Sequence, residues 1–142
     1  MELVPGISAH FVQSKKFKTN KITIRFTASL SLETVAGRML SASMLETANK
    51  AYPTSQVFRR YLASLYGTDI STSAYRRGQA HVLDLTFTYV RDEFLSKKNV
   101  LTSRILELVK QTLFAHLAQD GAFEPALFEI ERTQLLASLA TD

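Results

Sequence analysis

Three histidines are the side chains of this sequence best suited to bind a metal, but their positions form no ligand pattern. His10, His81 and His116 fall on two expected strands and at one expected helix end. None has a His, Asp or Glu partner at ligand spacing along its own element, so a metal site would have to be assembled from distant parts of the chain. The sequence contains no cysteine, which excludes disulfides, thiolate zinc sites and a cysteine nucleophile. Surface or strand-face histidines are the simpler interpretation.

Other motifs for catalysis or phosphate binding are also missing from the sequence. The five glycines are scattered, so neither GxxxxGK[ST] nor GxGxxG can be written, and there is no GxSxG elbow. Glu129 and Glu131 lie two positions apart on an expected helix and therefore point in different directions, which does not suit a general acid and base pair. The residues by themselves do not make an enzyme.

A cluster of lysines offers one alternative function. Lys15, Lys16, Lys18 and Lys21 fall in an expected turn, and clustered lysines can release counterions from nucleic acid. A nucleic-acid or phosphate-binding module would use these lysines together with two arginines of a later hairpin, Arg76 and Arg77. A solvated hairpin turn is the favoured interpretation, since Phe17 is the only interleaved aromatic residue that could stack on a base.

The elements that would position any site are indicated by the periodicity of apolar residues and by turn and cap residues. The predicted order is β-β-α-α-β-β-α-α, an α+β fold with helices packed on a mainly antiparallel sheet. The expected strands are 7–13, 21–29, 69–76 and 80–90, and the expected helices are 31–49, 54–66, 100–119 and one that starts near 124.

The helix that begins at Ser31 is the longest helical signal in the first half of the chain. Its apolar residues cover more than half of the helix circumference, so we expect it to pack against other elements on two sides. They are Leu32, Val35, Ala36, Met39, Leu40, Met44 and Leu45. Tyr52-Pro53 prevents the helix from continuing.

A length of 142 residues and 46% hydrophobic residues suit a single domain with its own core. No apolar run approaches the roughly 18 residues that span a membrane, and the N-terminus lacks a signal-peptide pattern. A cytoplasmic location is therefore expected. The last helix shows neither a Gly nor a Pro stop, and no later element covers its apolar face. We interpret residues 1–142 as the N-terminal part of one domain of a longer chain.

Three strings give the sequence a resemblance to a known family. They are Ser43-Met-Leu through Ala51-Tyr-Pro53, then Leu62-Ala-Ser-Leu-Tyr-Gly67 before the hairpin, and finally FEPALFEIERTQLLASL from Phe123 to Leu139. Together with the element order, they resemble the insulinase/pitrilysin zinc metallopeptidases, which include the mitochondrial processing peptidases. The resemblance implies that the chain is half of one insulinase/processing-peptidase-like (LuxS/MPP-like) metallohydrolase unit.

The resemblance also implies that the zinc site of the family is lost. In active members an inverted HxxEH motif holds zinc and a later glutamate completes the ligand set. Counting back from Tyr52-Pro53, the three motif places are Met39, Ala42 and Ser43, and the later ligand place is Ser138, while the family's earlier glutamate is kept as Glu131. We therefore expect no catalytic residue, no metal and no cofactor, and we interpret Met39 and Met44 as helix core.

The expected function is that of a non-catalytic, peptidase-like protein that binds a polypeptide substrate or serves as a subunit for an active metallopeptidase. Its partner would be a catalytic member of the family or a second copy of the chain, whereas membrane and nucleic acid are not expected partners. The motif-less bacterial relatives that the sequence most resembles are linked to modification of elongation factor P. One further alternative is an active zinc peptidase with other ligands, which is disfavoured because neither HxxEH nor HExxH can be written.

Overall fold

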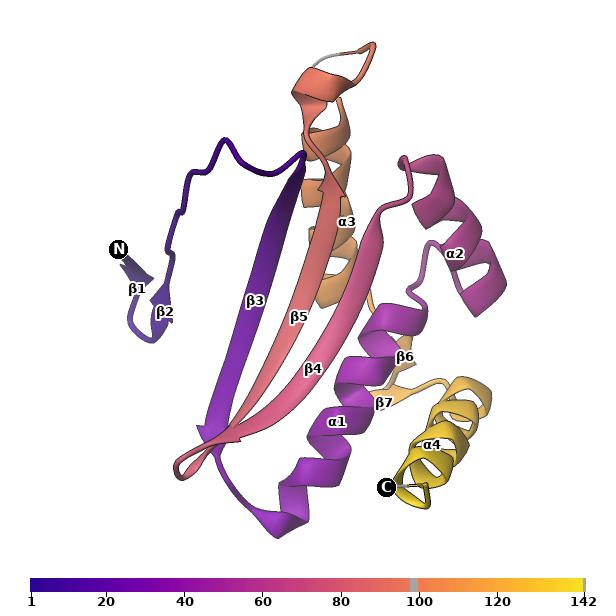
Figure 1. Cartoon of the computed structure of the whole chain (residues 1–142). Coiled ribbons are helices and arrows are strands. Elements are labelled where there is room, and N and C mark those ends of the chain that lie inside the picture. Colours follow the sequence, from indigo (N-terminus) through magenta and orange to yellow (C-terminus); the bar gives the residue numbers. More distant parts are fainter. Residues whose placement is uncertain (98–99, 142) are drawn as a thin grey trace.

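A three-stranded antiparallel sheet forms the centre of the computed structural model, which describes residues 1–97 and 100–141 (Figure 1). The middle strand pairs with both neighbours along its length, so that Thr86 lies opposite Thr23 on one side and Ser71 on the other. The order is β3 (Thr19–Ser29), β5 (Ala80–Val90) and β4 (Asp69–Arg77). The α+β class and the antiparallel sheet expected from the sequence are confirmed.

Four α-helices appear in the described residues, and the ones in contact with the sheet lie on a single face of it. Ser31 caps the first helix by accepting a hydrogen bond from the amide of Glu33, and Thr54 caps the second by accepting one from Val57. Serine and threonine are among the residues preferred at helix N-caps. The helices are α1 (Leu32–Thr47), α2 (Ser55–Ser64), α3 (Leu101–Phe114) and α4 (Pro125–Leu139), and a 3-10 turn, η1 (Asp92–Phe94), precedes α3.

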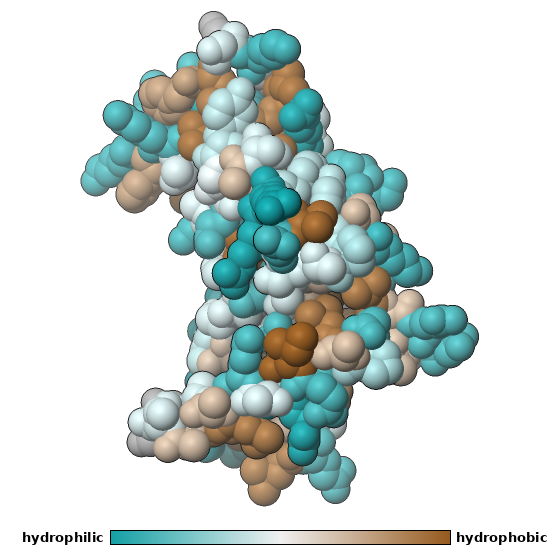
Figure 2. All heavy atoms as spheres, turned by 90° about the vertical axis from the view of Figure 1, so that its right-hand side faces the viewer, coloured by the Kyte–Doolittle hydropathy of each residue, from teal (hydrophilic) through white to brown (hydrophobic). Residues whose placement is uncertain are grey.

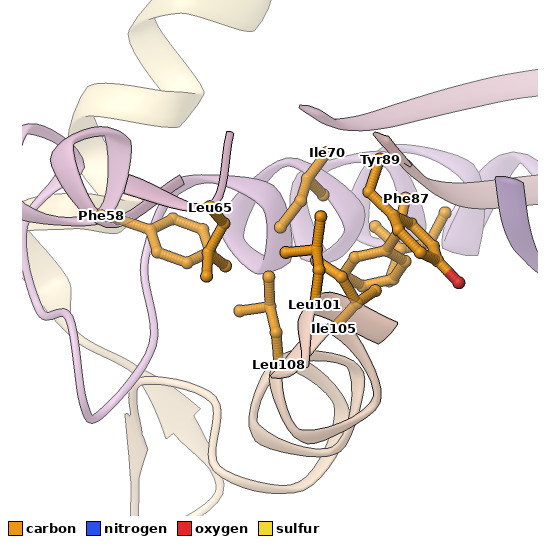
Figure 3. Packing of buried hydrophobic residues seen from close by; sticks show 9 residues of the cluster. Phe58, Leu65, Ile70, Phe87, Tyr89, Leu101, Ile105 and Leu108 are labelled. Atoms are coloured by element: carbon orange, nitrogen blue, oxygen red, sulfur yellow. The ribbon is translucent and has the colours of Figure 1, made fainter. Parts of the chain in front are cut away.

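The main hydrophobic core lies between the sheet, α2 and α3. Alternate residues of β5 point from the sheet toward these helices, as the period of a strand requires, and Phe87, Ile105 and Leu108 are fully buried. Figure 3 shows the side chains of this core, which come from β4, β5, α3 and the α2 region. The cluster consists of Phe58, Leu65, Ile70, Leu85, Phe87, Tyr89, Leu101, Ile105 and Leu108.

The opposite face of the sheet is polar. Arg25 of β3 forms a two-point ion pair with Asp84 of β5, with both N···O distances at 2.7 Å. Tyr75 of β4 donates a hydrogen bond to the same carboxylate at 3.3 Å. The guanidinium beside it holds the pKa of Asp84 below its usual value. A network of this kind ties the three strands together on the side away from the helices.

A second and smaller cluster joins α1 to α4. Met44, Ala48 and Leu127 are its buried members. The helix expected over 100–119 ends at Phe114. The backbone amide of Lys50 donates a hydrogen bond to the carbonyl oxygen of Ala115 at 2.9 Å. The chain then forms the hairpin of β6 (Ala118–Gln119) and β7 (Ala122–Phe123). As expected, α1 contacts the sheet on one side and α4 on the other, although Leu32 in its first turn is 96% exposed.

The N-terminal segment differs from the sequence expectation. Only Ile7–Ser8 (β2) of the expected strand 7–13 is a strand, and it pairs with β1 (Glu2–Val4) in a hairpin that stands away from the main sheet (Figure 1). Phe11 and Val12 are 86% and 93% exposed. Alternation alone therefore misassigned this segment, since a strand also needs a partner.

Residues 98–99, which precede the helix expected over 100–119, and residue 142, at the end of the expected final helix, lie outside the described residues. Within the part that is described, none of the helices has the length and apolar character that crossing a bilayer would require.

Candidate functional site

The four positions singled out from the sequence lie around one pocket. Met39, Ala42 and Ser43 of α1 and Ser138 of α4 line a cavity of ≈ 280 Å³, which we call the α1–α4 pocket. Residues 72–74 of β4 and Leu83 of β5 also line it. Positions 39 and 43 share a helix face because they are four residues apart. The structure therefore brings together residues that are separated by almost a hundred positions in the sequence.

Glu131 is the charged residue of this pocket. It projects from α4, is only 6% exposed, and its carboxylate accepts hydrogen bonds from two side chains of α1. Ser43 donates to one oxygen, and Thr47 donates to the other at 2.9 Å. Since Ser43 and Thr47 are also four residues apart, one face of α1 presents both hydroxyls to a single carboxylate. The hydrogen bonds link α1 and α4 at the pocket.

The donor set at the pocket does not fit zinc. A catalytic zinc site uses three imidazole or carboxylate ligands and an open position. Here Met39 supplies a thioether, Ala42 a methyl group, and Ser43 and Ser138 supply hydroxyls, so Glu131 is the one carboxylate. Zinc favours nitrogen, thiolate and carboxylate ligands over neutral hydroxyl or thioether groups. In the described chain, no group of three or more His, Cys, Asp or Glu side chains has an arrangement that could hold a metal.

A second cavity lies on the other side of the C-terminal end of α1. It measures ≈ 420 Å³ and is lined by residues of α1, α2 and the start of β4, among them Glu46, Arg59 and Asp69. Thr72 donates a hydrogen bond to Glu46 at 2.6 Å. Burial raises the pKa of Glu46, and the nearby carboxylates of Glu131 and Asp69 act in the same direction. The cavity at the end of α1 is therefore lined by two carboxylates, Glu46 and Asp69, and by one guanidinium, Arg59.

The three histidines lie apart and serve different local roles. His81 is buried, and its Nδ1 accepts a hydrogen bond from Arg38 at 3.0 Å. Arg38 also donates to the backbone carbonyls of Phe26 and His81, which fixes α1 against β3 and β5. His10 lies in the exposed N-terminal segment, and His116 forms an isolated β-bridge with Asn49.

The basic residues that could form a nucleic-acid surface are separated by the sheet. Lys15, Lys16 and Lys18 precede β3, whose first residue, Thr19, pairs with Val90 at one end of the sheet. Arg77 pairs with Ala80 at the opposite end, next to the hairpin. Eleven residues of β3 separate the two groups, a length of about 35 Å. The structure therefore does not assemble them into one patch.

Sequence reasoning missed part of the pocket. It did not consider Thr47, Thr72 and Gln134. Thr72 and Gln134 line the cavity, and Thr47 donates a hydrogen bond to Glu131. The spacing of Ser43 and Thr47 was a usable signal, because two hydroxyls four residues apart on an apolar helix have one common direction. Figure 2 shows hydrophobic patches among hydrophilic surface on the side of the molecule that is on the right in Figure 1. Hydrophobic side chains are also exposed on α4. They are Ile130, Leu136 and Leu139.

The chain is similar in sequence to a known protein and similar in fold to a solved structure. No family model matches the chain. It is 28% identical over 130 residues to a protein named "Probable inactive metalloprotease YmfF" from Bacillus subtilis (strain 168), covering 92% of this chain and 30% of that protein. A solved structure, "Crystal structure of a conserved protein from Enterococcus faecalis V583", superposes with a TM-score of 0.86 at 28% identity, again over 92% of this chain and 30% of the other.

These comparisons agree with the coarse interpretation from the sequence. The chain is similar to a metallopeptidase-like protein whose own name describes it as probably inactive. It spans about a third of the length of both relatives. Over 92% of its own length, the chain has the same fold as the matching part of the solved structure.

Proposed function

We propose that this chain is part of a non-catalytic, insulinase/pitrilysin-like protein that binds a polypeptide or an active metallopeptidase partner. The observation that carries the proposal is the composition of the α1–α4 pocket. The positions that would hold zinc and its general base in the active family are Met39, Ala42, Ser43 and Ser138, and all of them line this one cavity. Similarity to a protein named as a probable inactive metalloprotease supports the same conclusion.

The chemistry of these side chains explains the proposed lack of catalysis. Peptide hydrolysis by zinc needs a metal that lowers the pKa of bound water and a base that accepts its proton. A thioether, a methyl group and two hydroxyls provide neither function. The remaining carboxylate, Glu131, accepts one hydrogen bond from Ser43 and one from Thr47. The pocket thus retains its helical frame while its polar groups bond to one another.

Polypeptide binding is the activity that such a frame can retain. The two outer strands of the sheet, β3 and β4, each have one edge that pairs with no strand in the described part of the chain. An extended peptide can add to an edge of this kind through main-chain hydrogen bonds while neighbouring pockets select its side chains. The α1–α4 pocket is adjacent to β4, since residues 72–74 line it.

The proposal is tested by measuring binding and cleavage in the same sample. A fluorescein-labelled, permanently unfolded polypeptide such as reduced and carboxymethylated α-lactalbumin is mixed with the chain, with and without excess zinc. Fluorescence anisotropy reports binding, and mass spectrometry reports cleavage. We expect saturable binding with no cleavage in either condition. Zinc-dependent cleavage would refute the proposed lack of catalysis, and no binding in both conditions would refute polypeptide binding.

A further inference from the structure

Within the described part of the chain, Glu131 has no cationic partner of the kind that a buried carboxylate normally has. Ionisable side chains that are almost fully buried are usually paired with an opposite charge or a metal. Glu131 is 6% exposed, yet it takes part in none of the ion pairs formed within residues 1–97 and 100–141. None of the described residues that line the α1–α4 pocket is a lysine or an arginine.

The hydroxyls around Glu131 satisfy it only in part. The Thr47 hydroxyl lies 2.9 Å from the carboxylate and also 2.9 Å from the carbonyl oxygen of Ser43. A hydroxyl has one proton, so these two acceptors compete for it. Ser43 supplies one further hydrogen bond. An ionised carboxylate can accept about four hydrogen bonds, and Glu131 therefore keeps acceptor capacity that faces the cavity.

The surroundings of the pocket favour a positive ligand. The carboxylate bonds to the last two turns of α1, which ends at Thr47, and a helix C-terminus has a partial negative charge. No basic residue lies in the last turn of α1 to offset this charge. Glu46, which lines the neighbouring cavity, is a half-buried carboxylate that interacts electrostatically with Glu131. A cation in the α1–α4 pocket is therefore attracted by the Glu131 carboxylate and by the C-terminal end of α1.

The walls of the cavity define the rest of the ligand. Met39, Leu40, Leu83 and Leu135 give it apolar sides. The volume of ≈ 280 Å³ is at the small end of the range for ligand pockets and suits a single side chain. An alkyl stem with an ammonium end matches apolar walls that lead to a carboxylate, in the way that lysine normally buries its stem and keeps its charge paired.

We propose that the α1–α4 pocket binds the alkylammonium side chain of a lysine in a bound polypeptide, with Glu131 accepting hydrogen bonds from the ammonium group. Met39, Leu83 and Leu135 contact the methylene stem, and Ser43 and Thr47 hold the carboxylate in place. This assignment rests on the proposed polypeptide-binding function and adds the side chain that is selected.

The test is a titration followed by ¹H–¹⁵N NMR spectra of the chain. Nα-acetyl-lysine N-methylamide is compared with the norleucine analogue, which has the same stem without the charge. We expect the lysine compound to shift the amide signals of Ser43, Thr47 and Ser138 in a saturable manner. The norleucine compound should bind about tenfold more weakly or worse, the factor expected for losing a charged hydrogen bond.

Two glutamate variants separate a specific contact from a general charge effect. Glu131→Gln should weaken the lysine compound by about tenfold or more. Glu129→Gln removes the same charge two positions away, on an exposed side chain that pairs with Arg132, and should leave binding unchanged. Equal losses in the two variants, or equal binding of lysine and norleucine compounds, would overturn the assignment.

A third variant keeps the test informative if Glu131→Gln does not fold. Gln134→Lys places a lysine three residues from Glu131 on the pocket wall, where it can reach the carboxylate. It should raise Tm relative to Gln134→Met and abolish binding of the lysine compound. A Tm equal to that of Gln134→Met, with the lysine compound still bound, contradicts the proposal.

Two further outcomes identify the source of the ammonium group and separate this inference from the proposed function. Cadaverine binding as tightly as the lysine compound would assign the pocket to free diamines and overturn the lysine assignment. If unfolded polypeptide binds but the lysine compound does not, the lysine assignment fails while the proposed function stands. If the lysine compound fills the pocket but no polypeptide binds, the proposed function fails instead.

Discussion

Ser43 of α1 donates a hydrogen bond to Glu131 of α4, although 88 residues separate them in the sequence. Thr47 reaches the other oxygen of the same carboxylate, at 2.9 Å. The two hydroxyls hold α4 against α1 next to a small apolar cluster built on Met44 and Leu127. Because that cluster is small, polar bonds contribute a larger share of the packing between these helices than they do in the main core.

Removing either hydroxyl should therefore destabilise the protein. Ser43→Ala and Thr47→Ala each leave Glu131 with a missing partner, and we expect each to lower the free energy of unfolding by about 1–3 kcal/mol. Urea denaturation measures the change. Ser41→Ala is the matched control, because the Ser41 hydroxyl bonds only to the carbonyl of Gly37 within its own helix. A control loss as large as that of Ser43→Ala would show that the bond to Glu131 is not what matters.

Zinc binding should return when the substituted positions are restored. A variant with Met39→His, Ala42→Glu, Ser43→His and Ser138→Glu places two imidazoles four residues apart on α1 and a carboxylate across the pocket. Isothermal titration calorimetry should show one zinc ion bound per chain of the variant and none for the parent sequence. A control without Ser138→Glu has one ligand fewer and should bind more weakly. A folded variant that takes up no zinc would argue against the family correspondence of these positions.

Asp84 should make stability depend on pH in the acid range. The hydrogen-bonded Arg25 lowers the pKa of Asp84 from 3.8, so folding favours its ionised form. The contribution is present above the unfolded-state pKa and is lost as the pH falls below it toward the folded-state pKa. We expect Tm measured by circular dichroism to fall less steeply below pH 4 in Asp84→Asn than in the parent chain, because the variant has already lost the ion pair. Parallel curves would contradict this prediction.

Glu46 should act in the opposite sense. Burial raises the pKa of Glu46 above 4.5, so folding favours its protonated form and the group costs stability once it is ionised. Glu46→Gln keeps an acceptor for the Thr72 hydroxyl and removes the charge. We therefore expect a higher Tm than the parent at neutral pH and a smaller difference below pH 4.5. Glu33→Gln, an exposed charge in the first turn of the same helix, is the control and should give no gain.

The parts of the fold that follow from local chemistry were predictable from the sequence. The hairpin around Gly78 and the caps at Ser31 and Thr54 depend on residues only a few positions apart. Apolar and polar residues alternate in 80–90, which indicates a strand with one face against the core. In the structure this strand pairs with β3 and β4 through its edges, so one of its faces packs on the core. Local signals of this kind do not depend on where the rest of the chain lies.

The failures occurred where structure depends on distant partners. Residues 9–13 alternate like a strand, but nothing in the sequence says whether a neighbouring strand is present to pair with them. Residues 115–119 continue a helical pattern, yet a backbone bond to Lys50 and the β6–β7 hairpin redirect them.

The candidate site shows the same division. The family resemblance pointed to Met39 and Ser43, and the helical period puts residues four positions apart on one face. The approach of Glu131 depends on the packing of α4, a long-range contact that no local pattern reports.

The distance in sequence between the two halves of the pocket also sets the order in which it can form during synthesis. At about 5 to 20 residues per second, Ser43 leaves the ribosome about 4 to 18 s before Glu131, since the two are 88 positions apart. Strand β3 waits for β5 for a shorter time, about 3 to 12 s, because Asp84 follows Arg25 by 59 residues. The nascent chain therefore exposes the apolar side of α1 and an unpaired strand for seconds. For that period the N-terminal third of the sequence has the kind of exposed apolar surface and unpaired strand edge that favours aggregation.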